Sequence, residues 1–142
     1  VVVRMDGHAV VDPDYVRIRQ RIAPPELRAM PIHLRELGPS YRVTDWVGTQ
    51  HWLELIEESG GETAQRQPTH LRITLRMLET LRVPTLMVSG DADLLSPPAL
   101  MGLMAARVPD CRLVTIPEAG HSAYWERPTE WNRLVLDFLK QH

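Results

Sequence analysis

The chain has 142 residues, enough for one domain, and its 44% apolar and 24% charged residues are typical of a globular protein. Its 16 basic and 18 acidic residues give a formal net charge of −2, which offers no reason to expect nucleic acid or an anionic membrane as a partner. The single cysteine, Cys111, excludes an internal disulfide framework, and no apolar stretch approaches the roughly 20 residues of a membrane span, so we expect a cytoplasmic protein.

A short apolar run opens the chain. The residues "VVVRM" predict a buried strand that ends at Asp6-Gly7, a turn signal. Because strands rarely begin at residue one and the run has no initiator methionine, we expect either the downstream product of a cut or a piece that begins inside a domain.

The next stretch, to about residue 68, has helical patterns and no evident strand. Asp12 followed by Pro13 is typical of a helix start, because proline is tolerated at the first helical position. Between Pro24-Pro25 and Gly38-Pro39 the sequence predicts one or two short helices. The stretch "TDWVGTQHWLELIEESGG" predicts another helix, which ends at Gly60-Gly61.

From residue 69 onward, helix and strand patterns alternate. The leucines of "THLRITLRMLETLRV" recur at helical spacing, "PTLMVSG" is an apolar run of strand length, and "SPPALMGLMAARVP" predicts a helix with Ser96 as its N-cap. "CRLVTIP" predicts the next strand and "RPTEWNRLVLDFLKQ" a closing helix. This alternation is typical of parallel strands joined by right-handed helical crossovers, so we expect an α/β fold.

An acidic and a basic side chain follow the two predicted strands. Asp93 comes just after "PTLMVSG" and His121 just after "CRLVTIP". Loops that leave the carboxyl ends of neighbouring parallel strands meet at one edge of the sheet, so the carboxylate is expected to reach the imidazole. A carboxylate on one ring nitrogen fixes the tautomer and stabilises the imidazolium formed when the other nitrogen accepts a proton. Either residue alone is an ordinary loop residue, but their joint placement indicates a catalytic pair.

These two loops resemble those of the α/β-hydrolase superfamily. "GDAD", which ends at Asp93, resembles the loop that carries the acid of that family, and "GHS", with His121, resembles the loop that carries its base. The order of acid before histidine also agrees with the family. The resemblance implies that residues 69–142 form the C-terminal hydrolase core, residues 1–8 the sixth strand of the sheet and residues 9–68 an inserted helical cap. The implied fold is an α/β-hydrolase fold whose sheet is completed by a separate N-terminal chain.

The nucleophile that this resemblance implies is missing from the sequence. In the family it occupies a sharp strand-to-helix turn of the form G-x-S-x-G, with Asp or Cys replacing Ser in some members. Ser40, Ser89 and Ser122 do not stand in such a motif, and the family's oxyanion-hole HG is also absent. We therefore expect a complementary N-terminal polypeptide that carries the nucleophile and the oxyanion hole, without which the chain is inactive.

The resemblance implies hydrolysis without a cofactor. His121 would act as general base and then general acid, Asp93 would orient it, and an ester or similar acyl compound would be cleaved through a covalent intermediate on serine. Other interpretations keep the same pair. An aspartate nucleophile would give an epoxide hydrolase or haloalkane dehalogenase, and a C–C hydrolase, a lactonase, a cofactor-free peroxidase and a non-catalytic ligand-binding protein stay open.

Several further residues bear on the site. Asp91 is a second candidate for the acid but is interpreted as a turn residue, and Asp6 is a rival because some family members carry the acid after the sixth strand. In the predicted cap, Tyr41 and Trp46 are candidate walls of a pocket for a small apolar substrate, whereas Trp52 is expected in the core. The sequence has no metal-ligand spacing and no phosphate-binding loop, so no metal and no cofactor is expected.

Overall fold

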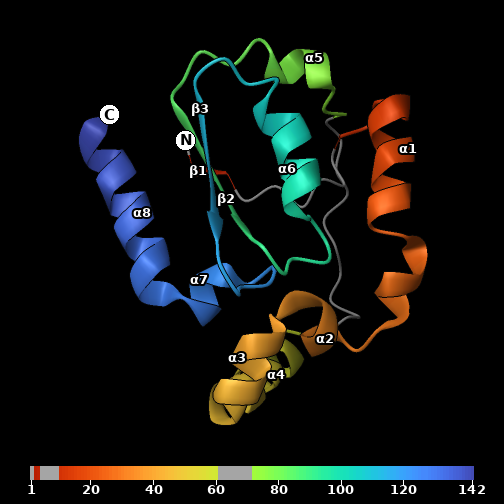
Figure 1. Cartoon of the computed structure of the whole chain (residues 1–142), viewed down its shortest axis with the longest axis vertical. Coiled ribbons are helices and arrows are strands. Elements are labelled where there is room, and N and C mark those ends of the chain that lie inside the picture. Colours follow the sequence, from red (N-terminus) through yellow and green to blue (C-terminus); the bar gives the residue numbers. More distant parts are fainter. Residues whose placement is uncertain (1, 4–9, 61–71) are drawn as a thin grey trace.

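The computed structural model describes residues 2–3, 10–60 and 72–142 of the chain (Figure 1). Within these residues three parallel strands form a sheet in the order β1-β2-β3, with β1 at Val2–Val3, β2 at Thr85–Gly90 and β3 at Cys111–Ile116. All three strands lie in the segments that were expected to form them, and the expected parallel pairing is confirmed. The turn expected at Asp6-Gly7 lies outside the described residues.

Strands β2 and β3 are aligned along their whole length. Thr85 lies opposite Cys111 at one end of the pair, and Gly90 lies opposite Ile116 at the other. The two strands therefore end level with one another, and the loops that follow them leave the sheet at the same edge. This register places the loop that carries Asp93 (residues 91–97, the acid loop) beside the loop that carries His121 (residues 117–122, the histidine loop).

Two helices cover opposite faces of the sheet, α6 at Pro98–Ala105 and α8 at Pro128–Gln141 (Figure 1). Successive side chains of a strand point to opposite faces, so neighbouring residues of one strand enter different clusters. Met87 and Leu113 pack in the cluster that contains α6, whereas Val88 and Val114 pack in the cluster that contains α8. Burial on both faces explains why β2 is an apolar run without polar alternation.

Helix α1, at Pro13–Ile22, belongs to the α6 side of the core. It begins at the predicted Pro13, but Asp12 does not cap it through its side chain; instead the Asp12 carboxylate accepts a hydrogen bond from the Leu75 N–H (2.6 Å). Tyr15 is 1% exposed, and its hydroxyl lies 3.6 Å from the sulfur of Met104 on α6. Because Tyr15 packs on α6, α1 is joined to the sheet through a shared hydrophobic cluster.

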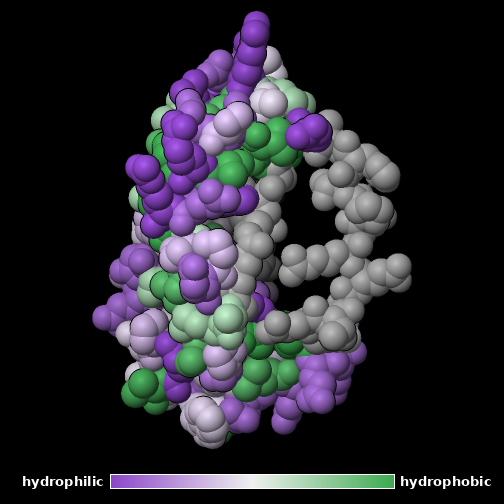
Figure 2. All heavy atoms as spheres, turned by 90° about the vertical axis from the view of Figure 1, so that its right-hand side faces the viewer, coloured by the Kyte–Doolittle hydropathy of each residue, from purple (hydrophilic) through white to green (hydrophobic). Residues whose placement is uncertain are grey.

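After α1, η1 at Pro25–Ala29 and α2 at Ile32–Glu36 are the short helices expected before Gly38-Pro39, and α4 at Trp46–Glu58 is the longer helix expected after them. Helix α3, at Pro39–Thr44 between them, was not predicted. Trp52 is 4% exposed, as expected of a core residue. The side chains of Val43, Trp46 and Val47 are exposed instead, and Figure 2 shows hydrophobic surface at the lower end of the molecule, where Figure 1 places α3 and α4.

Three local predictions differ from the structure. The helix expected from the leucine spacing begins at residues 69–71, which lie outside the described residues. From residue 72 onward it is shortened to α5 at Leu75–Leu78, because Ile73 instead pairs with Val10 in an isolated parallel bridge and the Thr74 hydroxyl caps the helix. Ser96 is not the N-cap of α6; Pro97 holds that place, and the Ser96 N–H donates to Asp93. The four-residue helix α7, at Ala123–Glu126, was not predicted.

In the part of the chain that the structure describes, no helix combines the length and the apolar content that crossing a lipid bilayer requires.

Candidate active site

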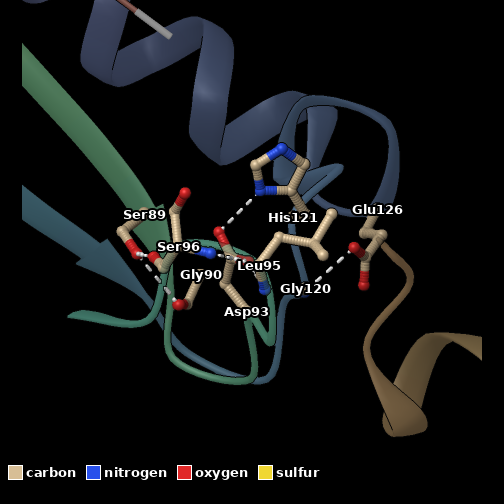
Figure 3. A network of polar contacts seen from close by, with 8 residues as sticks. All are labelled: Ser89, Gly90, Asp93, Leu95, Ser96, Gly120, His121 and Glu126. Atoms are coloured by element: carbon tan, nitrogen blue, oxygen red, sulfur yellow. Dashed lines mark hydrogen bonds and ion pairs between the residues drawn. The ribbon is translucent and has the colours of Figure 1, made fainter. Parts of the chain in front are cut away.

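The loop after β2 wraps around the carboxylate of Asp93. Its Oδ1 accepts hydrogen bonds from the backbone N–H groups of Leu95 (2.8 Å) and Ser96 (2.9 Å). An aspartate that accepts from the backbone two and three residues ahead closes a tight turn, so the loop conformation itself fixes the position of this carboxylate. Only 5% of the Asp93 side chain is exposed, and its second oxygen, Oδ2, is directed out of the turn (Figure 3).

The loop after β3 is tied to the acid loop by backbone contacts. The N–H groups of Asp91 and Ala92 donate to the carbonyls of Ile116 (3.1 Å) and Ala119 (2.9 Å). The Asp91 carboxylate in turn accepts from the Glu118 N–H at 2.7 Å, where Glu118 has a positive φ of 56°. Asp91 is therefore a turn residue that also links the two loops.

Close approach of these loops requires glycine at the end of β2. A Cβ atom on Gly90 would overlap the backbone carbonyl of Ala119, which cannot move without breaking its bond to Ala92. The first glycine of "GDAD" thus has a steric reason, and it lets the histidine loop lie directly on the acid loop.

The two loops bring His121 and Asp93 together. The Nδ1 atom of His121 lies 2.9 Å from Oδ2 of Asp93, and the two side chains are 7% and 5% exposed (Figure 3). Because an ionised carboxylate can only accept, Nδ1 carries the proton, and Nε2 is left with a free lone pair. Nε2 points away from Asp93, so it is free to accept a proton from a group on the far side of the ring.

No nucleophile meets this imidazole within the described residues. The recorded polar partner of His121 is Asp93, and the Ser89 hydroxyl donates instead to the carbonyls of Gly90 and Ser96. Ser122 is fully buried, and its hydroxyl has no hydrogen-bond partner. Within the described residues, the arrangement has the groups needed to hold and transfer a proton.

The comparisons with known proteins agree with this geometry. A family model described as the alpha/beta hydrolase fold matches residues 32–128, a range that includes both Asp93 and His121. The chain belongs to the α/β-hydrolase family. As predicted, it corresponds to the C-terminal part of that fold.

Three similar proteins represent the family. "Putative protein-lysine deacylase ABHD14B" of Homo sapiens is 25% identical over 123 residues, which cover 84% of this chain and 58% of that protein. The 2-hydroxy-6-oxononadienedioate/2-hydroxy-6-oxononatrienedioate hydrolase of Pseudomonas sp is 34% identical over 89 residues, 63% of this chain and 28% of that one. A thermophilic esterase from Thermogutta terrifontis shares the fold with a TM-score of 0.68 at 24% identity, over 96% of this chain and 54% of the esterase. This hydrolase-fold chain thus spans little more than half the length of the deacylase and the esterase.

A small cavity adjoins the acid–base pair of this hydrolase-fold chain. Its volume is about 20 Å³, space for roughly one water molecule, and its wall includes Ser89, Asp93, Ser96 and His121 together with apolar side chains. A larger open groove of about 450 Å³ lies between the end of α7 and the start of α8, and neither member of the pair lines it. Of these two spaces, only the smaller is bordered by the paired acid and base.

The predicted pocket walls do not line that cavity. Tyr41 is half-buried between α3 and α4, where burial and the neighbouring Asp45 carboxylate raise the pKa of its phenol. Trp46 is 63% exposed at the start of α4. The structure therefore brings Asp93 and His121 together but places neither Tyr41 nor Trp46 in the cavity beside them.

Sequence reasoning missed one buried charged residue of the site. Glu126, at the end of α7, is 6% exposed, and burial raises the pKa of its carboxyl above the ordinary value of 4.5 despite hydrogen bonds from two backbone N–H groups. The sequence signal was weak: a glutamate in "WERP" reads as the polar start of the closing helix.

Metal-binding and thiol chemistry find little support in the described residues. There, no three histidine, cysteine or carboxylate side chains are grouped so as to hold a metal ion. Cys111 is half-buried at the start of β3, and burial raises the pKa of its thiol, which disfavours the reactive thiolate.

Proposed function

We propose that this chain supplies the acid and the base of an α/β-fold hydrolase that cleaves esters or similar acyl compounds. The observation that carries the proposal is the 2.9 Å contact between His121 Nδ1 and Asp93 Oδ2, with the carboxylate fixed by two backbone N–H groups. A buried, pre-oriented pair of this kind has the geometry of general acid–base catalysis. The similarity to a deacylase and an esterase supports acyl transfer.

The proposed reaction has two halves. In the first, Nε2 of His121 takes the proton of a serine hydroxyl as its oxygen bonds to the acyl carbon, and the imidazolium then protonates the leaving alkoxide as the C–O bond breaks. In the second, a water molecule gives a proton to Nε2 as its oxygen bonds to the acyl carbon; the bond between that carbon and the serine oxygen then breaks, the imidazolium returns the proton to serine, and the carboxylic acid leaves. Asp93 stays ionised throughout and stabilises each imidazolium.

The serine and the oxyanion hole are proposed to come from a complementary N-terminal polypeptide. The Ser89 hydroxyl donates to the carbonyls of Gly90 and Ser96, the hydroxyls of Ser96 and Ser122 have no hydrogen-bond partner, and the chain covers 58% of the human deacylase and 54% of the esterase chain. Strand β1 pairs with β2 along one edge, so its other edge is the place where further strands of such a polypeptide would add.

A p-nitrophenyl ester assay on the complete enzyme, meaning this chain joined by its N-terminal polypeptide, tests the proposal. We expect His121→Ala to lower kcat by about 1,000-fold or more, and His142→Ala, at the chain end, to leave it unchanged. Wild-type activity in His121→Ala would contradict the proposal. A fluorophosphonate probe adds the identity of the nucleophile, since it labels an activated serine and not an aspartate.

Cleavage of a C–C bond is the second candidate. The relative from Pseudomonas sp that is 34% identical to this chain over 89 residues is named as a hydrolase of 2-hydroxy-6-oxononadienedioate and 2-hydroxy-6-oxononatrienedioate. The same acid–base pair would serve, with the leaving group a carbon that His121 protonates instead of an alkoxide. Turnover of 2-hydroxy-6-oxononadienedioate at a higher kcat/KM than p-nitrophenyl esters would favour this candidate.

A further inference from the structure

The carboxylate of Glu126 lies between two segments that are distant in the sequence. Its Oε1 accepts a hydrogen bond from the N–H of Gly120 (2.9 Å), the residue directly before His121 (Figure 3). Its Oε2 accepts from the N–H of Gly38 (2.8 Å), which lies in the connection between α2 and α3. One buried side chain thus accepts hydrogen bonds from the loop before α7 and from the α2–α3 connection at the same time.

The backbones of these two segments also touch directly. The N–H of Ser122 donates to the carbonyl of Glu36 at 3.0 Å, so hydrogen bonds lie on both sides of His121. A Cβ atom on Gly120 would lie only 2.6 Å from the Glu36 oxygen and the Gly38 nitrogen. The connection at residues 36–38 and the loop at residues 120–122 are therefore packed too closely for either to move alone.

A ring contact extends the same junction. Trp125, next to Glu126 on α7, lies with its ring centroid 5.7 Å from that of His51 on α4. Helix α7 therefore contacts α4 through this aromatic pair and the α2–α3 connection through the Glu126 carboxylate. Both contacts come from residues four and five positions after the histidine in the chain.

The chemistry of the junction requires a carboxylate. Two N–H donors face one side chain, and an ionised glutamate offers an acceptor oxygen to each. Glutamine has the same shape but only one acceptor, so its NH₂ group would face one of the two N–H donors. Leaving a buried donor without an acceptor is costly, which makes glutamine at this position a sharp probe of the hydrogen bonds.

We propose that Glu126 is a positioning residue that fixes the imidazole of His121 relative to the α2–α3 connection at residues 36–38. This inference rests on the proposed role of His121 as the base. Glu126 does not touch substrate; it acts by holding Gly120, and with it the ring, at the angle that keeps Nδ1 on Asp93. A displacement of the α2–α3 connection is then passed directly to the imidazole.

The test compares Glu126→Gln with Glu118→Gln in the complete enzyme. Glu118 lies in the same loop, its side chain is 66% exposed, and it serves as the matched control. For Glu126→Gln we expect kcat on a p-nitrophenyl ester to fall about 10- to 100-fold, the range seen for residues that orient a functional histidine, with KM changed less than about threefold. The Nδ1–H proton resonance of His121 should shift or broaden, whereas Glu118→Gln should leave both readouts at wild-type values.

The outcomes separate this inference from the proposed function. If His121→Ala abolishes turnover while Glu126→Gln keeps wild-type kcat and an unshifted Nδ1–H resonance, the positioning role is refuted and the function stands. If His121→Ala is active, the proposed function fails first. Should Glu126→Gln not fold, Glu126→Asp retains both acceptors but withdraws them by one methylene; we then expect a smaller loss of kcat and a shifted resonance, and wild-type values in both would overturn the inference.

Discussion

Replacing Asp93 by asparagine should invert the proton arrangement on His121. The carboxylate accepts at both oxygens: Oδ1 from two backbone N–H groups and Oδ2 from the Nδ1–H of His121. An asparagine has one acceptor, and the two backbone donors will hold its carbonyl oxygen on their side. Its NH₂ group then faces Nδ1 and donates to it, so the ring proton moves to Nε2. In that tautomer Nε2 can no longer accept the proton of a nucleophile.

The expected loss follows from this geometry. A histidine in the wrong tautomer lowers kcat on the order of 10,000-fold in a serine triad, equivalent to about 5.5 kcal/mol of transition-state stabilisation. Stability should change much less, because all three hydrogen bonds at position 93 still find partners and lose only their charge assistance, about 1–3 kcal/mol in total.

The assay is kcat/KM on a p-nitrophenyl ester together with the ¹⁵N resonances of the imidazole, which report the tautomer. Asp110→Asn, an exposed aspartate in the turn before β3 at the opposite end of the sheet, is the control. Activity of Asp93→Asn within tenfold of wild type, or a proton still on Nδ1, would show that this carboxylate does not set the tautomer.

Two further predictions concern the histidine loop. Gly120→Ala should lower the free energy of unfolding by about 1–3 kcal/mol in denaturant titration, because a Cβ there would lie 2.6 Å from backbone atoms of residues 36 and 38; an unchanged midpoint would contradict the packing. The pH dependence of the free energy of unfolding should also show the effect of Glu126, because burial raises the pKa of its carboxyl in the folded state. A raised pKa means that the folded chain holds the proton longer, so this residue's contribution falls as pH rises from the ordinary 4.5 through the folded pKa. In urea titrations across that window, wild type should lose stability relative to Glu126→Gln as pH rises. Wild type gaining stability relative to the variant over the same pH range would contradict the prediction.

The sequence was most informative where local pattern and tertiary structure agree. Strand β2 is a continuous apolar run because both of its faces are buried, and its level, parallel alignment with β3 brings Asp93 and His121 to one edge of the sheet. The meeting of acid and base was thus predictable from strand order alone, with no knowledge of side-chain contacts.

The misses arise where a tertiary contact or a neighbouring turn overrides the local pattern, and for two of them the partner lies far along the chain. The leucine spacing around Leu75 fits a longer helix, but the bridge between Ile73 and Val10 takes residues that the helix would need. Ser96 fits an N-cap, but it closes the turn on Asp93 through its N–H, and the helix begins one residue later, with Pro97 at the N-cap. Glu126 bonds to Gly38, 88 positions away, and no local pattern carries that information.

The level ends of β2 and β3 also determine which changes in chain length the site can tolerate. Deleting one residue within β3 would draw the histidine loop back by about 3.3 Å, more than the whole 2.9 Å separation of Nδ1 and Oδ2, and would turn every later side chain of the strand to the opposite face. An insertion before β3, in the turn at Pro109-Asp110, leaves the aligned pairs intact. Deletion and insertion scanning across residues 108–118 should therefore show an abrupt boundary at Cys111, with tolerance of length changes before it and loss of function after it.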